Sequence, residues 1–435
     1  MKQTNTHPLI ADYLDQVCRH VRATEMHRRI RDEMESHLLD LMDEQMDDGV
    51  EEEEAVRQAI LQMGDSAAVG KQLHRIYKPK VEWRLLAYVL GFLVVGLFTM
   101  YGTPVNYFTE KVDRYWLSSL MGVGLMLTIA FTDYRKLLQY SFHLYVLPVG
   151  MLLFLIWYEY YVHGNLISDT SHFRNIPFGP ISMYLFLISI AGMLLTRTWR
   201  FRSTASKLMV FVLLPAILLL MTQSYLHLKL YIFGFLVLLM YTKTVRKEKL
   251  LLFIASVGAF IGAWLLDNYT FERILDWMQP TKDPQGGGYM YLLTMETIRS
   301  AGFWGHGFGA PSQMPRIDTA FKFAYLIQSY GWFGGLLISL VVALFMMRLA
   351  RVIKEVDEPY GKHLIVSIVP IFSLHFFWPL LMSVGMLPTI SDLVIPFLSY
   401  SLIGFALINF AILGLILSVH RHRNSIGKPH TFLAK

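Results

Sequence analysis

Apolar residues along the chain follow two different patterns, and the pattern changes at about residue 80. Before that point they recur every three or four positions among charged residues, as at Ile10, Leu14 and Val17, which is the spacing of an amphipathic helix. From residue 83 onward the chain has unbroken apolar runs of about twenty residues, long enough to cross a hydrocarbon core of roughly 30 Å. The pattern predicts an all-α protein, with a small helical domain over 1–80 and a membrane domain over 83–421.

The first eighty residues predict three or four short helices. Gly49 is placed to end the second helix, and Glu51 to Glu54 put negative charge in the first turn of the next, where it favours the helix dipole. Gly64 marks a further helix end. Four adjacent Glu on a helix do not all face one ion, so a solvated helix start is favoured over a metal site.

The membrane domain is predicted to contain ten spans, joined by short loops except for a long one over 269–321. The approximate bounds of the spans are 83–103, 115–133, 140–161, 177–196, 206–224, 226–243, 250–268, 322–348, 363–387 and 394–419. Lys and Arg gather in the loops after the second, fourth, sixth and eighth spans, and the alternate loops hold fewer for their length. Because basic loops stay on the cytoplasmic side, both termini are predicted to be cytoplasmic, with a tail over 422–435, and the long loop is predicted to lie outside.

Composition narrows the class of protein further. With 54% hydrophobic and 17% charged residues, the chain is not an ordinary soluble domain. Its net charge of +6 is spread over the connecting loops, which indicates a role in topology and in contacts with anionic lipids, and not a nucleic-acid surface. Cys18 is the single cysteine, which excludes an internal disulfide.

The stretch 284–335 combines glycine runs with polar side chains and leads into an apolar helix that begins at about Phe321. Glycines at this density let the backbone turn tightly or approach a ligand closely. They are Gly286, Gly287, Gly288, Gly302, Gly305, Gly307 and Gly309. The polar residues between and after them are Glu296, Arg299, His306, Gln313, Arg316, Asp318 and Lys322. The stretch is either a binding or catalytic loop or an ordered loop without chemistry.

In its order of residues, this stretch resembles the loop before the eighth membrane helix of the SEDS family of bacterial cell-wall proteins, the FtsW/RodA/SpoVE group. Residues 385–400, G-M-L-P-T-I-S-D-L-V-I-P-F-L-S-Y, are similar to a family motif that contains P-F-x-S-Y. Residues 201–208, F-R-S-T-A-S-K-L, are similar to the family's Q-P-S-E-L-A-K-L. The resemblance covers 83 to about 421. It implies ten membrane helices with a large external loop, in the bacterial cell membrane.

The resemblance also implies an activity, from which this chain departs at one position. Active members of the family polymerise lipid II into glycan strands, and their presumed catalytic residue is the Asp of an H-T-D-F motif. Ala320 occupies that position here, and Asp318 occupies the position of the His. Thr204, Gln328 and Ser329 likewise stand where the family has acids. Whether the chain is an enzyme is therefore open.

Two roles for Asp318 follow from its position. It is the single acid in P-R-I-D-T-A-F, so it is the candidate catalytic base, displaced by two residues, that removes a proton from the attacking sugar hydroxyl. Alternatively, the Asp-Thr pair just ahead of an apolar run suits the N-cap of the helix that follows.

Binding of lipid II requires cations or amide donors for its diphosphate. Arg299, Arg316 and Lys322 are predicted to supply them; the alternative is that these side chains anchor the loop among lipid headgroups. Further substrate-binding candidates are Gln313, Lys207, Ser399 and Tyr400, the last three of which rest on the resemblance. No cofactor and no protein-bound metal is predicted, and a divalent cation that assists the departing diphosphate is left open.

Three functions are consistent with these observations. The first is a lipid II glycan polymerase acting in cell shape, division or sporulation. The second is a non-catalytic regulatory paralogue that binds a polyprenyl-diphosphate lipid or a partner transpeptidase. The third is translocation of lipid-linked precursors. In addition, the run M-G-D-S-A-A-V-G-K-Q-L at 63–73 resembles the helical prefix found ahead of some bacterial permeases, which implies contacts of residues 1–80 with a cytoplasmic protein.

Overall fold

The structure, a computed structural model, describes most of the chain and is helical throughout its regular elements. The described residues are 7–22, 27–77, 82–102, 108–163, 176–196, 199, 202–390, 393–401 and 403–422. The chain divides into two compact units, one made of 1–81 with 421–435 and the other of 82–420. Most of the predicted tail lies outside the described residues. The all-α membrane fold predicted from the sequence is confirmed.

The first unit contains four helices: α1 (Pro8–Arg19), α2 (His27–Asp47), α3 (Glu52–Met63) and α4 (Ser66–Tyr77). The apolar positions that set the predicted periodicity form its core, including Ile10, Leu38 and Val56, each fully buried. Gly49 and Gly64 follow α2 and α3 with φ of 88° and 90°, which only glycine adopts readily. The predicted helix ends at these two glycines are confirmed.

The second unit contains the membrane helices. In chain order they are α5 (Trp83–Tyr101), α6 (Phe108–Phe131), α7 (Lys136–Gln139), α8 (Ser141–His163), α9 (Phe178–Met193), α11 (Thr204–Leu208), the π-turn η2 (Met209–Leu213), α12 (Leu214–Met221), α13 (Tyr225–Tyr241), α14 (Arg246–Leu266), α15 (Asn268–Met278), α16 (Tyr289–Ser300), α17 (Lys322–Glu355), α18 (Pro359–Ser383) and α19 (Ile403–Arg421). Within the described residues, eight stretches are long and apolar enough to span a membrane, and α9 and α13 are shorter apolar helices. Because α11, η2 and α12 form one of the eight, each predicted span has an apolar helix.

One predicted bound is wrong: the tenth span does not begin at 394, because residues 393–401 are not helical and Phe397 has a φ of 66°. Two further features were not predicted. The helix of the eighth span, α17, is kinked at Gly331, whose φ and ψ are 69° and −175°. The long loop over 269–321 contains nearly all of α15 in addition to α16, which covers its amphipathic stretch.

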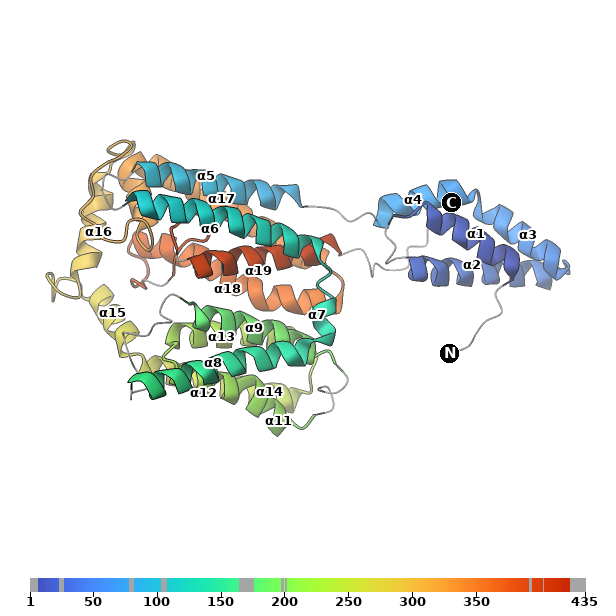
Figure 1. Ribbon diagram of the computed structural model, residues 1–435, viewed down its shortest axis with the longest axis horizontal. Helices are drawn as coiled ribbons and strands as arrows, with labels where there is room; N and C mark the ends of the chain where they lie inside the picture. Colours follow the sequence, from blue (N-terminus) through green and yellow to red (C-terminus); the bar gives the residue numbers. More distant parts are fainter. Residues whose placement is uncertain are drawn as a thin grey trace. The chain divides into compact units, whose positions relative to one another are not determined.

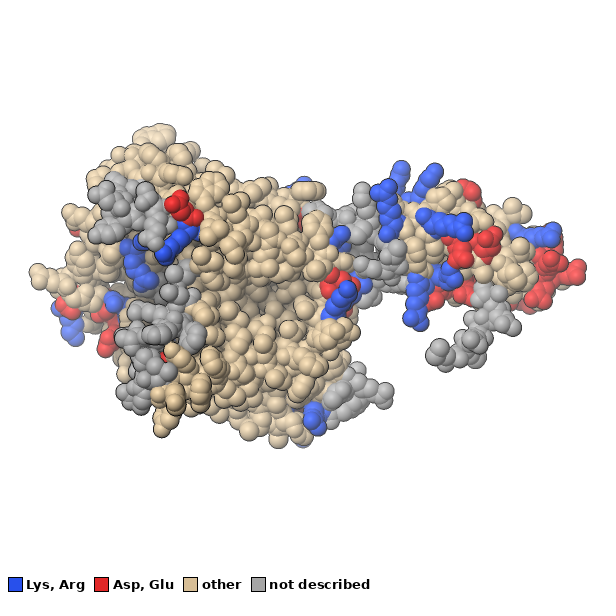
Figure 2. Space-filling view, viewed as in Figure 1, with Lys and Arg blue, Asp and Glu red and all other residues tan. Residues whose placement is uncertain are grey.

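The second unit is a bundle with two distinct ends. Helices α15 and α16 cross one end, here called the α16 end, and α7 and α11 lie at the opposite end, here called the α11 end (Figure 1). On the face shown in Figure 2, the middle of this unit is free of charged side chains, which gather at its ends. A surface that contacts the hydrocarbon core of a bilayer is expected to lack charged side chains, as this one does.

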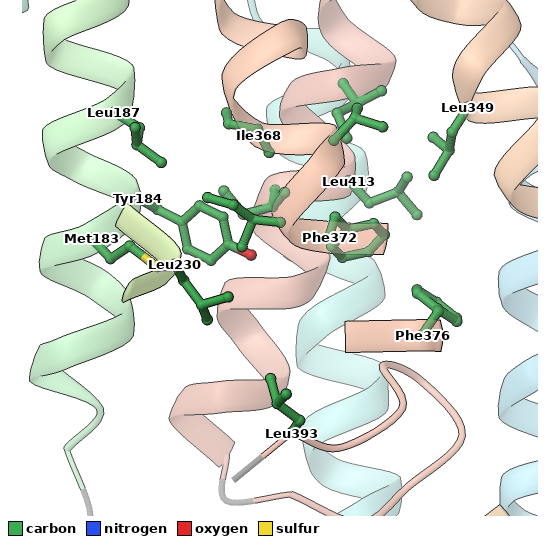
Figure 3. Close-up of a cluster of buried hydrophobic side chains, with 14 of the residues drawn as sticks. Met183, Tyr184, Leu187, Leu230, Leu349, Ile368, Phe372, Phe376, Leu393 and Leu413 are labelled. Carbon is green, nitrogen blue, oxygen red and sulfur yellow. The ribbon is translucent and has the colours of Figure 1, made fainter. Parts of the chain in front are cut away.

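The interior of the bundle is apolar. In Figure 3, Tyr184 and Leu187 of α9 face Leu230 of α13 and Ile368 and Phe372 of α18, and all five are buried. This packing fixes the helices and leaves the polar residues of the connecting segments at the α16 end.

Candidate functional site

The glycine-rich segment 302–309 is joined to the kink of α17 by backbone hydrogen bonds. Gly302, Gly305 and Gly307 have φ of 60°, 76° and 95°, a region that side-chain-bearing residues rarely adopt. In these conformations, the amide of His306 donates to the carbonyl of Gln328 at 2.9 Å, and the amide of Gly307 donates to that of Ser329 at 2.9 Å. The backbone groups that the kink frees are thereby satisfied by the loop.

Asp318 lies at the centre of a small charged site beside this loop. Its side chain is buried, and its Oδ2 accepts a hydrogen bond from Nζ of Lys111, on α6, at 2.8 Å. Its main-chain oxygen accepts from the amide of Tyr400 at 2.8 Å. The Lys111 ammonium also lies 5.8 Å from the centre of the Tyr400 ring, within cation–π range. Residues from three distant parts of the chain thus meet at Asp318.

Lys322 adds a second cation to the site. It is the first residue of α17, is only 1% exposed, and interacts electrostatically with Asp318. Lys111 therefore forms the ion pair with Asp318, and Lys322 interacts with the same carboxylate electrostatically. The alternative role of Asp318 as a helix cap is wrong, because the N-cap of α17 is Phe321 and no side chain caps it.

Comparisons with known proteins decide the family. The model of the FtsW/RodA/SpoVE family, described as cell cycle protein, matches residues 82–425. This chain belongs to the FtsW/RodA/SpoVE family. It is an integral membrane protein of the bacterial cell membrane.

Individual relatives in the family are distant. The chain is 28% identical over 171 residues to stage V sporulation protein E of Bacillus subtilis, covering 38% of this chain and 46% of that protein. It is 26% identical over 341 residues to a probable peptidoglycan glycosyltransferase FtsW of Idiomarina loihiensis, covering 72% of this chain and 79% of that one. The sporulation protein is therefore matched over less than half its length.

A solved structure shares the fold. It concerns the structural coordination of polymerisation and crosslinking by a peptidoglycan synthase complex, and one chain of it superposes with a TM-score of 0.58 at 21% identity, covering 79% of this chain and 98% of that chain. At this identity the likeness establishes the fold alone.

The position of the family's presumed catalytic acid is apolar in this FtsW/RodA/SpoVE protein. Ala320 is 1% exposed and clusters with Phe321 and Met382, against which Met290 and Trp378 pack. An acid at this position would be buried against these apolar side chains, which is costly. The charged side chains lie instead two residues to either side of it, at Asp318 and Lys322.

The other predicted site residues of this family member are distributed unevenly. Arg299, Gln313 and Arg316 are exposed at the α16 end, and Arg316 has a φ of 56°. Ser399 is buried next to Tyr400, and among the described residues its hydroxyl has no hydrogen-bond partner. The two arginines are therefore open to solvent, whereas the Ser399 hydroxyl is enclosed.

Lys207 lies far from the other predicted site residues. It lies in α11, at the opposite end of the bundle (Figure 1), where its Nζ is 2.8 Å from Oε1 of Glu248 on α14. Both side chains are largely buried. Its place in this structure is a structural ion pair between two helices.

The residue of this site that the sequence did not indicate is Lys111. It precedes the second predicted span, in a connection predicted to lie outside, and the structure places it on α6. A lysine there runs against the tendency of basic residues to stay inside, and that exception was the available signal. Within the described ranges, no three His, Cys, Asp or Glu side chains are close enough to share a metal ion.

Proposed function

We propose that this FtsW/RodA/SpoVE protein binds lipid II at the α16 end and polymerises it into glycan strands during cell-wall synthesis. The observation that supports this most is the arrangement of Lys111 and Lys322 around the single carboxylate of Asp318. Lys111 and Lys322 would form charge-assisted hydrogen bonds with the diphosphate of lipid II. Arg316, which is exposed and lies two residues before Asp318 in the chain, adds a forked donor.

The proposal includes an orientation. The α16 end faces the outside and both termini are cytoplasmic, because basic residues gather at the α11 end: Arg135 and Lys136 stand before and at the start of α7, and Arg246 and Lys247 begin α14. A cysteine introduced at the exposed Gln313, in a Cys18→Ser background, is expected to react with a membrane-impermeant maleimide added to intact cells. Labelling only after the cells are broken would reverse the orientation and remove the basis of the proposal.

Asp318 serves as the catalytic base in this scheme, and Lys111 controls its availability. Nζ of Lys111 donates a hydrogen bond to Oδ2 of Asp318, so that oxygen already has a partner. A bound diphosphate competes for the Lys111 ammonium and releases Oδ2. The sugar hydroxyl then attacks the anomeric carbon of the second lipid II, its proton passes to Asp318, and the bond to the diphosphate breaks. Lys111 and Lys322 stabilise the charge on the departing lipid diphosphate.

Variants of the purified protein with labelled lipid II test this scheme. Asp318→Asn is expected to keep lipid II binding and to abolish glycan strands, because the amide does not accept the proton. Lys111→Met is expected to weaken lipid II binding at least about tenfold, the effect of losing one charge-assisted hydrogen bond worth roughly 1.5–3 kcal/mol. Lys282→Met, an exposed cation at the same end, is the matched control and should bind normally. Full strand synthesis by Asp318→Asn would exclude Asp318 as the base.

The burial of Ala320 and the pairing of Asp318 with Lys111 also favour a second function. In it, the protein binds lipid II or a related polyprenyl-diphosphate lipid without polymerising it and acts through a partner transpeptidase. The solved structure that shares the fold belongs to a complex coordinating polymerisation and crosslinking, which supports such a partner. Saturable binding of lipid II without strands, in the wild-type protein with divalent cation present, would decide for this function.

A further inference from the structure

Helix α15 exposes a row of apolar side chains at the α16 end, just beyond the last residue of the membrane helix α14. Phe271, Leu275 and Met278 are 56%, 50% and 65% exposed. They stand four and three positions apart, so they share roughly 60° of the helix circumference. In Figure 1, α15 lies across the end of the bundle and not along the membrane helices. A continuous exposed apolar face on such a helix indicates an interaction surface.

The other faces of α15 already have partners. On the face toward the protein, Nε1 of Trp277 donates a hydrogen bond to the carbonyl of Gly385 at 2.9 Å. On a third face, Nη1 of Arg273 lies 3.8 Å from Oδ2 of Asp276, and the guanidinium lies 5.1 Å from the ring centre of Tyr269. The helix therefore has one face against the protein, one charged face and one exposed apolar face, as helices at a membrane surface do.

The rotation of α15 about its own axis is fixed at its first turn. Asp267 is its N-cap, and Oδ1 of Asp267 accepts a hydrogen bond from the amide of Thr270 at 3.0 Å. Oδ2 of the same residue lies 2.7 Å from Nζ of Lys229 on α13. Together with the hydrogen bond of Trp277 near the other end, these contacts keep the apolar face directed away from the bundle.

Helix α16 provides an internal comparison. It crosses the same end of the bundle (Figure 1), but its exposed residues are Tyr289, Glu296, Arg299 and Ser300. Each of these carries a polar group, as expected of a helix surface in water. Two helices of one loop thus have surfaces that suit different surroundings.

The apolar face of α15 follows directly in the chain on the lipid-facing surface of α14. Among the eight spans found in the described residues, α14 is the least buried. Its last two residues, Leu265 and Leu266, are 76% and 57% exposed, and Asp267 alone separates them from α15. Because exposed leucines at the end of a span belong in hydrocarbon, α15 begins at the level where the chain leaves the hydrocarbon core.

We infer that α15 lies in the interface of the bilayer, with Phe271, Leu275 and Met278 inserted among the acyl chains. Glu272 and Arg273 are then on the side that faces water. Helices of this kind bury their apolar face about 5–10 Å into the boundary between headgroups and acyl chains. The partner of this surface is the lipid leaflet on the side of the α16 end. The inference is independent of the proposed function, because α15 is not part of the site at Asp318.

Nitroxide labels at single cysteines test the inference in the full chain, reconstituted into vesicles of phosphatidylcholine and phosphatidylglycerol. In a Cys18→Ser background, labels are attached to Leu275→Cys and Met278→Cys, and to Glu296→Cys on α16 as the matched control. Electron paramagnetic resonance measures the accessibility of each label to oxygen, which concentrates in lipid, and to a water-soluble nickel chelate. The ratio of oxygen to nickel accessibility is expected to be severalfold higher at both α15 positions than on α16. All three native side chains are exposed, so the melting temperatures should not change.

Two results would overturn the inference. If the nickel chelate reaches the α15 labels as readily as the label on α16, α15 lies in water. If neither oxygen nor nickel reaches the α15 labels and their motion is restricted, another protein chain covers this face. Neither result bears on the binding of lipid II, because the labelled positions lie outside the site at Asp318 and the vesicles hold no lipid II.

Discussion

Gly305 and Gly331 lie backbone against backbone where the loop meets the kink of α17. A Cβ on Gly305 would overlap the amide nitrogen of Gly331, and a Cβ on Gly331 would overlap the carbonyl of Phe303. Both residues also have positive φ. The loop reaches the helix interior because neither residue has a side chain, and this contact holds the segment that leads to Asp318.

The contact predicts that Gly305→Ala is far more damaging than the same change at Gly307. Both positions pay the cost of an L-residue at positive φ, roughly 1–2 kcal/mol. Only Gly305 adds a steric overlap, since a Cβ on Gly307 meets nothing within 4 Å. Overlap in a packed interior costs about 1–3 kcal/mol more. The difference is measured as the melting temperatures of the two variants in the same detergent, and equal values would show that the close approach does not exist.

Lys229, on α13, and Asp267, the N-cap of α15, form a buried ion pair in which Nζ lies 2.7 Å from Oδ2. The pair predicts a strong coupling between these two helices. Lys229→Met leaves a buried carboxylate without its partner, which typically costs about 3–5 kcal/mol. The double variant Lys229→Met with Asp267→Asn is expected to recover most of that loss, because no charge is then left buried. Both stabilities are measured by denaturant unfolding in detergent.

The matched comparison for this pair is Arg273 with Asp276, which lie 3.8 Å apart on α15 and are partly exposed. Removing Arg273 is expected to change stability by less than about 1 kcal/mol. If Lys229→Met lowers the free energy of unfolding no more than Arg273→Met does, the carboxylate of Asp267 has found another partner or water.

The helical pattern of the chain was predictable, because each membrane span and each amphipathic helix is a local property of twenty residues or fewer. The kink in α17 was not, because hydropathy averages over Gly331 and the cause is the carbonyl of Phe303, in a different segment. Residues 393–401 were assigned to the tenth span for a similar reason, since apolar composition does not distinguish a buried non-helical segment from a helix.

The candidate site was predictable in part. The resemblance indicated Asp318 and Tyr400, and the chemistry of a diphosphate indicated Lys322; the structure places Tyr400 and Lys322 next to Asp318. Their partner Lys111 is 207 positions away from Asp318, and no local pattern specifies a contact over that distance. The pair of Lys229 and Asp267 was missed for the same physical reason.

The hydrogen bonds of Glu82 predict that the protein is less stable in acid. Its carboxylate accepts both forks of Arg348, from Nε at 2.8 Å and Nη2 at 2.7 Å. Burial would raise the pKa of Glu82, but the hydrogen bond from Arg348 and the nearby His420 outweigh burial and lower it below the ordinary value of 4.5. A lowered pKa means that the stabilisation is complete above pH 4.5 and is lost as the pH falls through the folded-state pKa.

The measurement is the difference in unfolding free energy between the wild-type protein and Glu82→Gln across this pH range. It is expected to be constant above about pH 5 and to shrink below pH 4.5, because protonation turns the wild-type side chain into a neutral one. A difference that does not change with pH would show that Glu82 is not ionised in the folded protein.

The four-helix unit predicts that one buried leucine decides whether residues 7–77 are folded. Leu38 is fully buried in its core, whereas Leu61, on α3, is 79% exposed. Leu38→Ala is expected to cost about 2–5 kcal/mol, as much as the whole stability of a domain of this size, roughly 3–5 kcal/mol. In the full chain, the variant should lose amide-exchange protection over residues 7–77 and keep it in α5–α19, because the two units have separate cores. Leu61→Ala should change neither. Loss of protection in both units of Leu38→Ala would show that they unfold as one.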